Sequence, residues 1–208
     1  IAHGATGHNG GFLATYFERS FASIADEFGL EMAAEGQKAV DSSWELIQEL
    51  RADANMQTPM LEFTGYAACA TLDELLVHLH NNSLRKKSGL PILDIFIAEE
   101  SEYLEKIPKQ YENHYKLLPH KEILDLTETV DESYFAVLCE RKGAMNSALF
   151  CEELINYLLV KYADRFTLAE QTKVRRLVLK DNHAVIDISK NQKMTASKVV
   201  LCTNGFDS

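Results

Sequence analysis

Apolar residues recur at helical spacing in the first quarter of the chain. Residues 16–28 place their apolar side chains on one helical face, and Gly29 interrupts the pattern. A second periodic stretch covers residues 30–50 and includes Trp44, the only tryptophan. The pattern predicts two consecutive helices, and Trp44 is interpreted as an apolar anchor of the core rather than as a stacking partner for a cofactor.

The next stretch alternates between strand and helix signals. Residues 62–70 have the composition of a strand, and Thr71 with Glu74 three positions later forms a capping box that predicts a helix. Residues 92–97 are a short apolar run. Residues 99–106 are predicted to form a charged helix whose acidic side chains face solvent.

The helix predicted after Thr71 contains two histidines and ends in a basic triplet. His78 and His80 lie two positions apart, so they point to different faces of a helix and cannot share a metal ion. We interpret them as surface or boundary histidines. The triplet at residues 85–87, Arg-Lys-Lys, is interpreted as part of a solvated loop.

The region after residue 110 has a weaker pattern. Residues 110–132 indicate an irregular connection or short edge strands, and residues 135–140 predict a strand. Gly143 is expected to begin a turn, and Ser147 is expected to open a helix that runs to about residue 162.

The last third of the chain is rich in β-branched residues. Residues 172–179, 184–189 and 194–202 predict a meander of three strands with polar turns between them. Residues 199–202 are continuously apolar, which is typical of a strand buried on both faces. The sequence as a whole therefore predicts a mixed α/β (α+β) fold.

Composition and charge narrow the classes of partner. A formal net charge of −10 argues against nucleic acid and against an anionic membrane surface, since both require clustered Lys and Arg. No apolar run approaches the ~18 to 20 residues that cross a bilayer. The four cysteines lie far apart in sequence and lack metal or redox spacing, which favours reduced core residues in a cytoplasmic protein.

Four glycines fall within eight residues in the segment Gly-Ala-Thr-Gly-His-Asn-Gly-Gly-Phe at residues 4–12. Glycine allows positive φ and close approach of another molecule to the main chain, so the run suggests a loop that closes over a flat or anionic ligand. The alternative is an ordinary surface loop. The segment lacks the Lys-Ser/Thr of a Walker loop and the G-x-G-x-x-G spacing, so it is not the primary phosphate cradle of a nucleotide fold.

Together with residues 198–206, Lys-Val-Val-Leu-Cys-Thr-Asn-Gly-Phe, this loop resembles the FAD-dependent oxidoreductases of the D-amino-acid oxidase and glycine oxidase superfamily. The similarity is greatest to amine-oxidising members with an A-[ST]-G-R-N-G-G loop. It implies an incomplete FAD-binding Rossmann-like domain with a β-meander at residues 1–60 and 146–208. Residues 61–145 would form a substrate-domain sheet with flanking helices.

The resemblance also implies that the dinucleotide-binding strand and loop of the family precede Ile1, and that a flavin segment follows Ser208. We therefore expect an internal fragment that binds FAD poorly by itself. The implied activity is oxidation of a small-molecule amine or amino acid at its C–N bond, with hydride passing to the flavin. No catalytic side chain and no metal ligand is assigned.

The resemblance assigns FAD contacts at both ends of the chain. Main-chain N–H groups of the first loop and the Thr6 hydroxyl would donate to the cofactor, and the backbone of Val174 would meet the adenine edge. The implied cofactor-binding residues are Ala5, Thr6, Gly7, His8, Asn9, Gly10, Gly11, Val174, Thr203, Asn204 and Gly205.

His8 stands where many amine-oxidising relatives have arginine. Against the dimethylglycine and sarcosine dehydrogenase branch, whose loop reads G-[ST]-T-W-H-A-A-G, His8 aligns with the histidine that carries the flavin covalently. The alternative is that His8 only hydrogen-bonds the cofactor or a neighbouring carbonyl.

A second hypothesis comes from another functional class. The chain would then be a non-catalytic α+β interaction domain that does not bind FAD as isolated, with the glycine run as a turn and the meander as an ordinary sheet. The sequence does not predict the oligomeric state.

Overall fold

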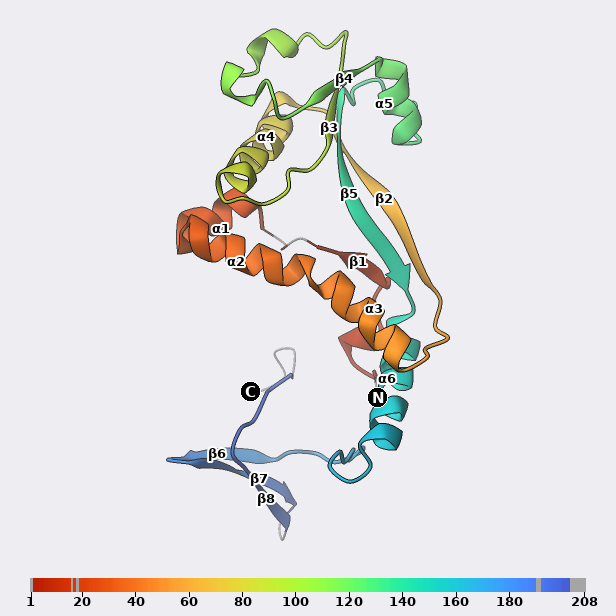
Figure 1. The fold of residues 1–208 in the computed structure, drawn as a ribbon, viewed down its shortest axis with the longest axis vertical. Helices are drawn as coiled ribbons and strands as arrows, with labels where there is room; N and C mark the ends of the chain where they lie inside the picture. The colour runs from red at the N-terminus through yellow and green to blue at the C-terminus, as the bar shows by residue number, and fades with distance from the viewer. Residues whose placement is uncertain (1, 16, 18, 190–191, 203–208) are drawn as a thin grey trace. The chain divides into compact units, whose positions relative to one another are not determined.

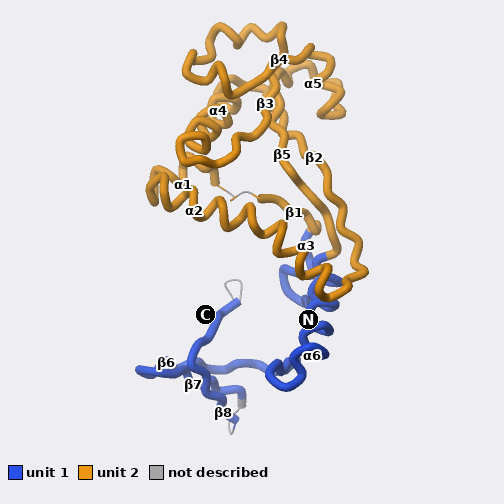
Figure 2. The backbone as a smooth tube through the Cα atoms, in the orientation of Figure 1, with its two compact units in different colours: residues 1–9, 147–208 blue, residues 10–146 orange. Residues whose placement is uncertain are grey.

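The computed structural model describes the chain except for residues 1, 16, 18, 190–191 and 203–208. It divides into two compact units, which we call unit 1 (residues 1–9 and 147–208) and unit 2 (residues 10–146) (Figure 2). Each unit contains both helices and strands. The predicted mixed α/β class is therefore confirmed.

The sheet of unit 2 is built around one long strand, β5 (Ala136–Met145) (Figure 1). β2 (Met60–Cys69) pairs with it in antiparallel orientation over all ten residues. On the other edge of β5, β1 (Phe12–Ala14) pairs near one end and β3 (Ile95–Ala98) near the other. β4 (Lys116–Leu118) then adds to β3 in parallel.

The first predicted helix is shorter than its periodicity indicates. α1 (Phe21–Phe28) begins after Ser20, whose hydroxyl accepts a hydrogen bond from the Ser23 N–H, and Gly29 ends it at φ +86°. The start of the helix is therefore fixed by the Ser20 cap and not by the apolar residues before it, because the serine hydroxyl satisfies an unpaired N–H of the first turn.

The second predicted helix is two helices, α2 (Leu30–Asp41) and α3 (Ser43–Asp53), with a break at Ser42. The Ser42 hydroxyl donates to the Ala39 carbonyl at 2.9 Å, and the Ser43 hydroxyl donates to the Val40 carbonyl at 2.6 Å. Serine hydroxyls that bond nearby carbonyls compete with the regular helical ladder, which explains the interruption.

The predicted capping box is confirmed at the start of α4 (Leu72–Lys87). The Thr71 hydroxyl accepts from the Glu74 N–H, and the Glu74 carboxylate accepts from the Thr71 N–H at 3.0 Å. Hydrogen bonds to this carboxylate, first from the Ala70 N–H and then from Thr71, lower the pKa of Glu74, since they favour its charged form.

The charged helix predicted at residues 99–106 is wrong, whereas the irregular connection or short edge strands predicted at residues 110–132 are confirmed in part: β4 is a short edge strand, but a helix follows it. Residues 99–106 form turns and a short 3-10 helix, η2 (Leu104–Lys106), in place of a charged α-helix. A further 3-10 turn, η3 (Lys109–Tyr111), and one α-helix, α5 (His120–Leu126), follow. α5 starts directly after Pro119, a residue that tolerates a helix start because it has no N–H to satisfy.

Gly143 does not begin a turn. It lies inside β5, where a Cβ atom would be 2.7 Å from the Leu61 carbonyl oxygen and 2.8 Å from Cη2 of Trp44. Trp44 is 3% exposed, so its interpretation as a core anchor is confirmed. Gly143 is therefore explained by the close packing of the Trp44 ring on the strand and not by a turn of the chain.

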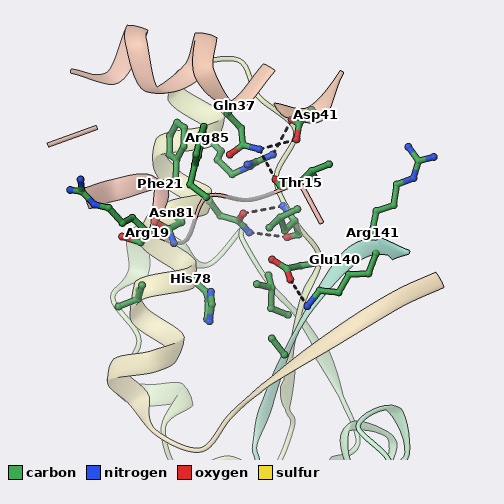
Figure 3. Close-up of a pocket in the computed structure, with 18 residues that line it drawn as sticks. Thr15, Arg19, Phe21, Gln37, Asp41, His78, Asn81, Arg85, Glu140 and Arg141 are labelled. Atoms are coloured by element: carbon green, nitrogen blue, oxygen red, sulfur yellow. Dashed lines mark hydrogen bonds and ion pairs between the residues drawn. The ribbon is translucent and has the colours of Figure 1, made fainter. Parts of the chain in front are cut away.

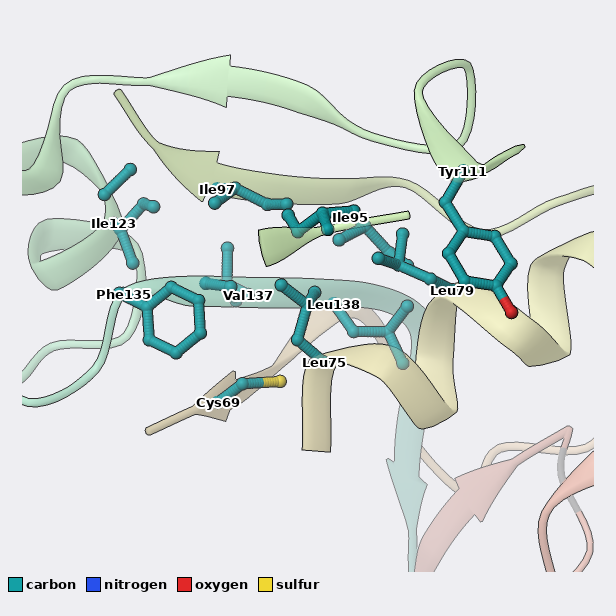
Figure 4. Packing of buried hydrophobic residues seen from close by; sticks show 13 residues of the cluster. Cys69, Leu75, Leu79, Ile95, Ile97, Tyr111, Ile123, Phe135, Val137 and Leu138 are labelled. Atoms are coloured by element: carbon teal, nitrogen blue, oxygen red, sulfur yellow. The ribbon is translucent and has the colours of Figure 1, made fainter. Parts of the chain in front are cut away.

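The main core of unit 2 lies between α4, α5 and the central strands (Figure 4). Leu75 and Leu79 of α4 are completely buried, as are Ile97, Ile123 and Val137. A smaller cluster joins α1 and α2 to the loop after α4. Burial of large aliphatic side chains of this kind contributes roughly 1.5–3 kcal/mol each, so α4 is fixed firmly on the sheet.

Unit 1 contains the 3-10 turn η1 (Ala5–Gly7), the helix α6 (Ser147–Lys161) and an antiparallel meander of β6 (Arg176–Lys180), β7 (His183–Ser189) and β8 (Gln192–Ala196). The helix predicted from Ser147 and the three-stranded meander are confirmed. Residues 199–202 are not a strand: Val200 is 85% exposed, so the expected burial on both faces is wrong for this run.

Across the described part of the chain, no helix is both long enough and apolar enough to cross a bilayer.

Gly143→Ala tests the packing of Trp44 on β5. The added methyl group overlaps the Leu61 carbonyl and the Trp44 ring, so we expect a loss of about 1–3 kcal/mol in the free energy of unfolding. Gly36→Ala is the matched control: its Cβ meets nothing closer than 3.5 Å inside α2, so it should stabilise by about 0.5–1 kcal/mol. Denaturant unfolding measures both, and equal effects would contradict the assignment.

His114 is 7% exposed and, among the residues described, neither ring nitrogen has a hydrogen-bond partner. Burial, with a smaller contribution from Lys86, lowers the pKa of His114. The unfolded chain therefore binds more protons than the folded chain between that lowered pKa and about 6.5, and stability falls as the pH drops through this window. His114→Phe should flatten the pH dependence of unfolding, and an unchanged slope would contradict this account.

Candidate functional site

The glycine-rich loop forms a 3-10 turn in unit 1. η1 (Ala5–Gly7) is closed by the Gly7 N–H, which donates to the Gly4 carbonyl at 3.0 Å, and by the His8 N–H, which donates to the Ala5 carbonyl at 3.2 Å. A Cβ at Gly7 would lie 1.8 Å from the Ala2 carbonyl oxygen. Glycine is therefore required at position 7 by close approach of the backbone.

Side chains of the loop bond its own carbonyl groups. His8 Nδ1 lies 2.9 Å from the Gly4 carbonyl oxygen, and Asn9 Nδ2 donates to the Ala5 carbonyl at 3.1 Å. A carbonyl oxygen only accepts, so the proton of a neutral His8 ring resides on Nδ1 and Nε2 keeps its lone pair. The Gly4 and Ala5 carbonyls each thus receive two hydrogen bonds.

The third carbonyl, that of Thr6, is held in the same way. Asn9 Nδ2 donates to it at 2.8 Å, and the Ser147 hydroxyl lies 2.5 Å from it and 3.1 Å from Asn9 Oδ1. Ser147 is the first residue of α6. The loop therefore lies against the amino end of a helix, where the helix dipole is positive.

The hydrogen-bond donors of this turn are exposed to solvent. No acceptor within the described ranges is recorded for the N–H groups of Ala5 and Thr6 or for the Thr6 hydroxyl, and both residues are exposed. The carbonyl oxygens of Gly4, Ala5 and Thr6 each already accept two hydrogen bonds. The exposed polar groups of the turn are therefore mainly donors. Such an arrangement favours a ligand with electron-rich oxygen or nitrogen atoms.

The last glycine of the run, Gly11, is required by the sheet of unit 2. Gly11 has φ +70°, and a Cβ there would lie 2.1 Å from the Met145 carbonyl oxygen. Its own carbonyl accepts from the Met145 N–H at 2.9 Å. Gly11 thus brings the chain into β1 beside β5, which accounts for this glycine without a ligand.

The other residues implied as FAD contacts are not brought to this loop by any recorded bond. Val174 is 55% exposed and precedes β6, which begins at Arg176 rather than at Thr172 as predicted. The segment Thr203, Asn204 and Gly205 lies outside the described residues. Ser147 was expected only as a helix start, and nothing local in the sequence marks it as a partner of Asn9.

A cavity of about 470 Å³ is a second candidate site, entirely within unit 2 (Figure 3). It is lined by α1, α2, α4, β5 and the segment before α1. Arg85 is 7% exposed in its wall, and the whole basic triplet forms the last turn of α4, so its interpretation as part of a solvated loop is wrong. Lys86 and Lys87 are solvent-exposed, but they lie on the helix.

His78 and Glu140 also line this cavity. Burial lowers the pKa of His78, and the nearby carboxylates of Glu140 and Glu74 oppose that change. The Glu140 carboxylate is paired with Lys142 Nζ at 3.2 Å. The neutral form of the His78 ring is therefore favoured inside a wall of mixed charge.

The remaining reactive side chains do not form a site. No group of three His, Cys, Asp or Glu residues suited to a metal ion occurs among the residues placed by the structure. All four cysteines are free, and burial raises the pKa of Cys69 to about 12. Its thiol is therefore not a nucleophile at neutral pH.

Comparison of the chain with protein-family models, with curated proteins and with solved structures gave no match.

Proposed function

We propose that this chain is part of an FAD-dependent oxidoreductase that oxidises an amine or amino acid at its C–N bond, and that the loop at residues 4–9 contacts the flavin cofactor. The observation that carries the proposal is the saturation of three consecutive carbonyls, Gly4, Ala5 and Thr6, beside exposed donors. FAD presents pyrophosphate oxygens and electron-rich ring atoms, which require donors.

The position of the loop at the start of α6 supports the same ligand class. The partial positive charge at a helix amino end and nearby main-chain N–H groups both favour a phosphate or another anion. α6 carries no acidic residue in its first turn, so nothing there offsets this charge. FAD would supply the hydride-accepting chemistry, and the loop would bind and orient it.

The apolar surface of α6 supports the proposed Rossmann-like environment. Leu149, Leu159 and Val160 are 46%, 37% and 82% exposed, and no residue of this helix is fully buried. A helix that is apolar around its circumference requires cover on several sides. In this proposal the cover is a further layer of the FAD-binding domain.

The alternative proposal, a non-catalytic interaction domain, draws on the same exposed apolar side chains, because such surfaces also bind protein partners. It offers no explanation for the donor-rich loop. Flavin content therefore separates the two functions.

The cellular setting and partners are part of the proposal. Four free cysteines favour a reducing compartment, so we place the protein in the cytoplasm. The net charge of −10 disfavours nucleic acid, and the partner is a small-molecule amine or amino acid.

Protein made from the complete gene should contain FAD, measured by absorbance and by release on denaturation. Asn9→Ala removes the amide that holds the Ala5 and Thr6 carbonyls, so we expect FAD affinity to fall about tenfold to thirtyfold. Gln57→Ala, which removes an exposed amide bonded to the Asn55 carbonyl, is the control and should leave affinity unchanged. A folded protein that neither contains nor binds FAD would refute the proposal.

His8 decides how the flavin is held. Its exposed Nε2 lone pair is compatible with covalent attachment, but its Nδ1 bond to the Gly4 carbonyl already gives the ring a structural role. We expect a non-covalent contact: acid precipitation should leave all flavin in the supernatant, and the peptide containing His8 should keep its unmodified mass. Flavin in the pellet together with a flavin-sized mass increase on that peptide would establish attachment instead.

A further inference from the structure

The cavity of unit 2 contains one cation whose charge is poorly matched. Of the four Lys and Arg side chains in its lining, three have a carboxylate oxygen within hydrogen-bond distance. The pairs are Arg19 with Glu27 at 2.6 Å, Arg141 with Glu62 at 2.7 Å and Lys142 with Glu140 at 3.2 Å. Arg85 is the most buried of the four, and its nearest carboxylate oxygen, on Asp41, is 3.8 Å away.

The guanidinium of Arg85 therefore has unused donors. Its Nε–H donates to the Pro91 carbonyl at 2.8 Å, and no hydrogen bond from either Nη group is recorded to any described residue. A guanidinium has five N–H donors, and a buried cation is stable only when its donors and its charge are satisfied. These donors are therefore open to an acceptor that enters the cavity.

The Asp41 carboxylate is shared between Arg85, at 3.8 Å from its Oδ2, and a second partner. Its Oδ1 accepts from Gln37 Nε2 at 2.8 Å, and the same Gln37 nitrogen donates to the Thr15 carbonyl at 2.8 Å (Figure 3). Gln37 is 3% exposed, so this bridge is fixed by packing. The carboxylate thus orients Arg85 by charge without occupying its outer nitrogens.

We propose that this cavity binds a small organic carboxylate with an apolar body, with the carboxylate on the Nη groups of Arg85. A carboxylate matches the planar fork of a guanidinium through two parallel hydrogen bonds. Phe21, Val77 and Leu138 supply apolar walls for the rest of the molecule. The volume of about 470 Å³ lies within the range of small-molecule sites.

The charge of Arg85 selects against one competing ligand class, because an amine would place its positive charge beside the guanidinium. The site makes no use of the loop at residues 4–9, so it does not depend on the proposed flavin function.

Three probes of matched shape test the ligand class: 3-phenylpropionate, its neutral amide 3-phenylpropionamide, and the cationic 3-phenylpropylamine. They are titrated into the purified full chain without added FAD, and binding is followed by amide chemical shifts and calorimetry. We expect saturable binding of the carboxylate, at least about tenfold weaker binding of the amide and none of the amine. Absence of saturable carboxylate binding, or equal affinity for the amide, would overturn the proposal.

Two variants test whether the carboxylate binds in this cavity. Arg85→Lys keeps the positive charge but removes the planar pair of guanidinium nitrogens. Val77→Trp fills the cavity from an exposed position of α4 and leaves the hydrogen bond of Arg85 to Pro91 in place. Each should weaken 3-phenylpropionate about tenfold. Arg51→Lys is the matched control, since Arg51 also donates to a carbonyl, that of Thr58, but lies outside the cavity.

Thermal melting verifies that each variant is folded. If Arg85→Lys does not fold, Val77→Trp alone decides, because Val77 is 49% exposed and tolerates a larger side chain. Unchanged affinity in Val77→Trp, or an equal loss in Arg51→Lys, would refute the site. All measurements are made without FAD, so a negative result leaves the flavin proposal standing, and loss of the flavin proposal leaves this one standing.

Discussion

The pairing of β5 is the constraint on which unit 2 depends. One edge of this strand is occupied along all ten residues by β2, while the other edge is shared by β1 at residues 142–144 and β3 at residues 136–138. Between them, among the residues that the structure describes, one backbone bond, from the Cys139 N–H to the Asp94 carbonyl, continues the edge. The cavity forms beside this split edge, because β1 leads on to α1 and α2 whereas β3 follows α4. The cavity position is thus a consequence of strand pairing.

The packing of Trp44 shows why local rules fail on this strand. The indole lies against the Gly143 backbone, and the guanidinium carbon of Arg141 lies 4.3 Å from its ring centroid. In the sequence, a glycine that makes room for an aromatic ring cannot be told from a glycine that forms a turn. To separate the two cases one must know that α3 packs on this strand, and α3 is some ninety residues away in sequence. The residues next to Gly143 therefore do not reveal its role.

Features whose cause is local were predictable from sequence. The Thr71 and Glu74 cap, the helix from Ser147 and the meander all rest on residues within a few positions of each other. Arg85 shows the opposite case: it belongs to a basic triplet by sequence, yet tertiary packing buries it while Lys86 remains exposed. Most of the elements were therefore predictable, whereas the cavity was not, because its wall depends on contacts between α2, α4 and β5.

The candidate flavin loop was found by its glycines, but the glycines are not equivalent. Gly11 is required by the Met145 carbonyl and Gly7 by the Ala2 carbonyl, so each is explained by protein packing alone. What distinguishes the first half of the run is its hydrogen bonding, in which Asn9 and the distant Ser147 occupy the carbonyls and leave the donors exposed. These bonds contribute only about 0.5–1.5 kcal/mol each to stability, because water would otherwise satisfy the same acceptors. The proposal of a bound cofactor therefore rests on which hydrogen-bond donors and acceptors of residues 4–9 remain exposed. The number of glycines alone would not support it.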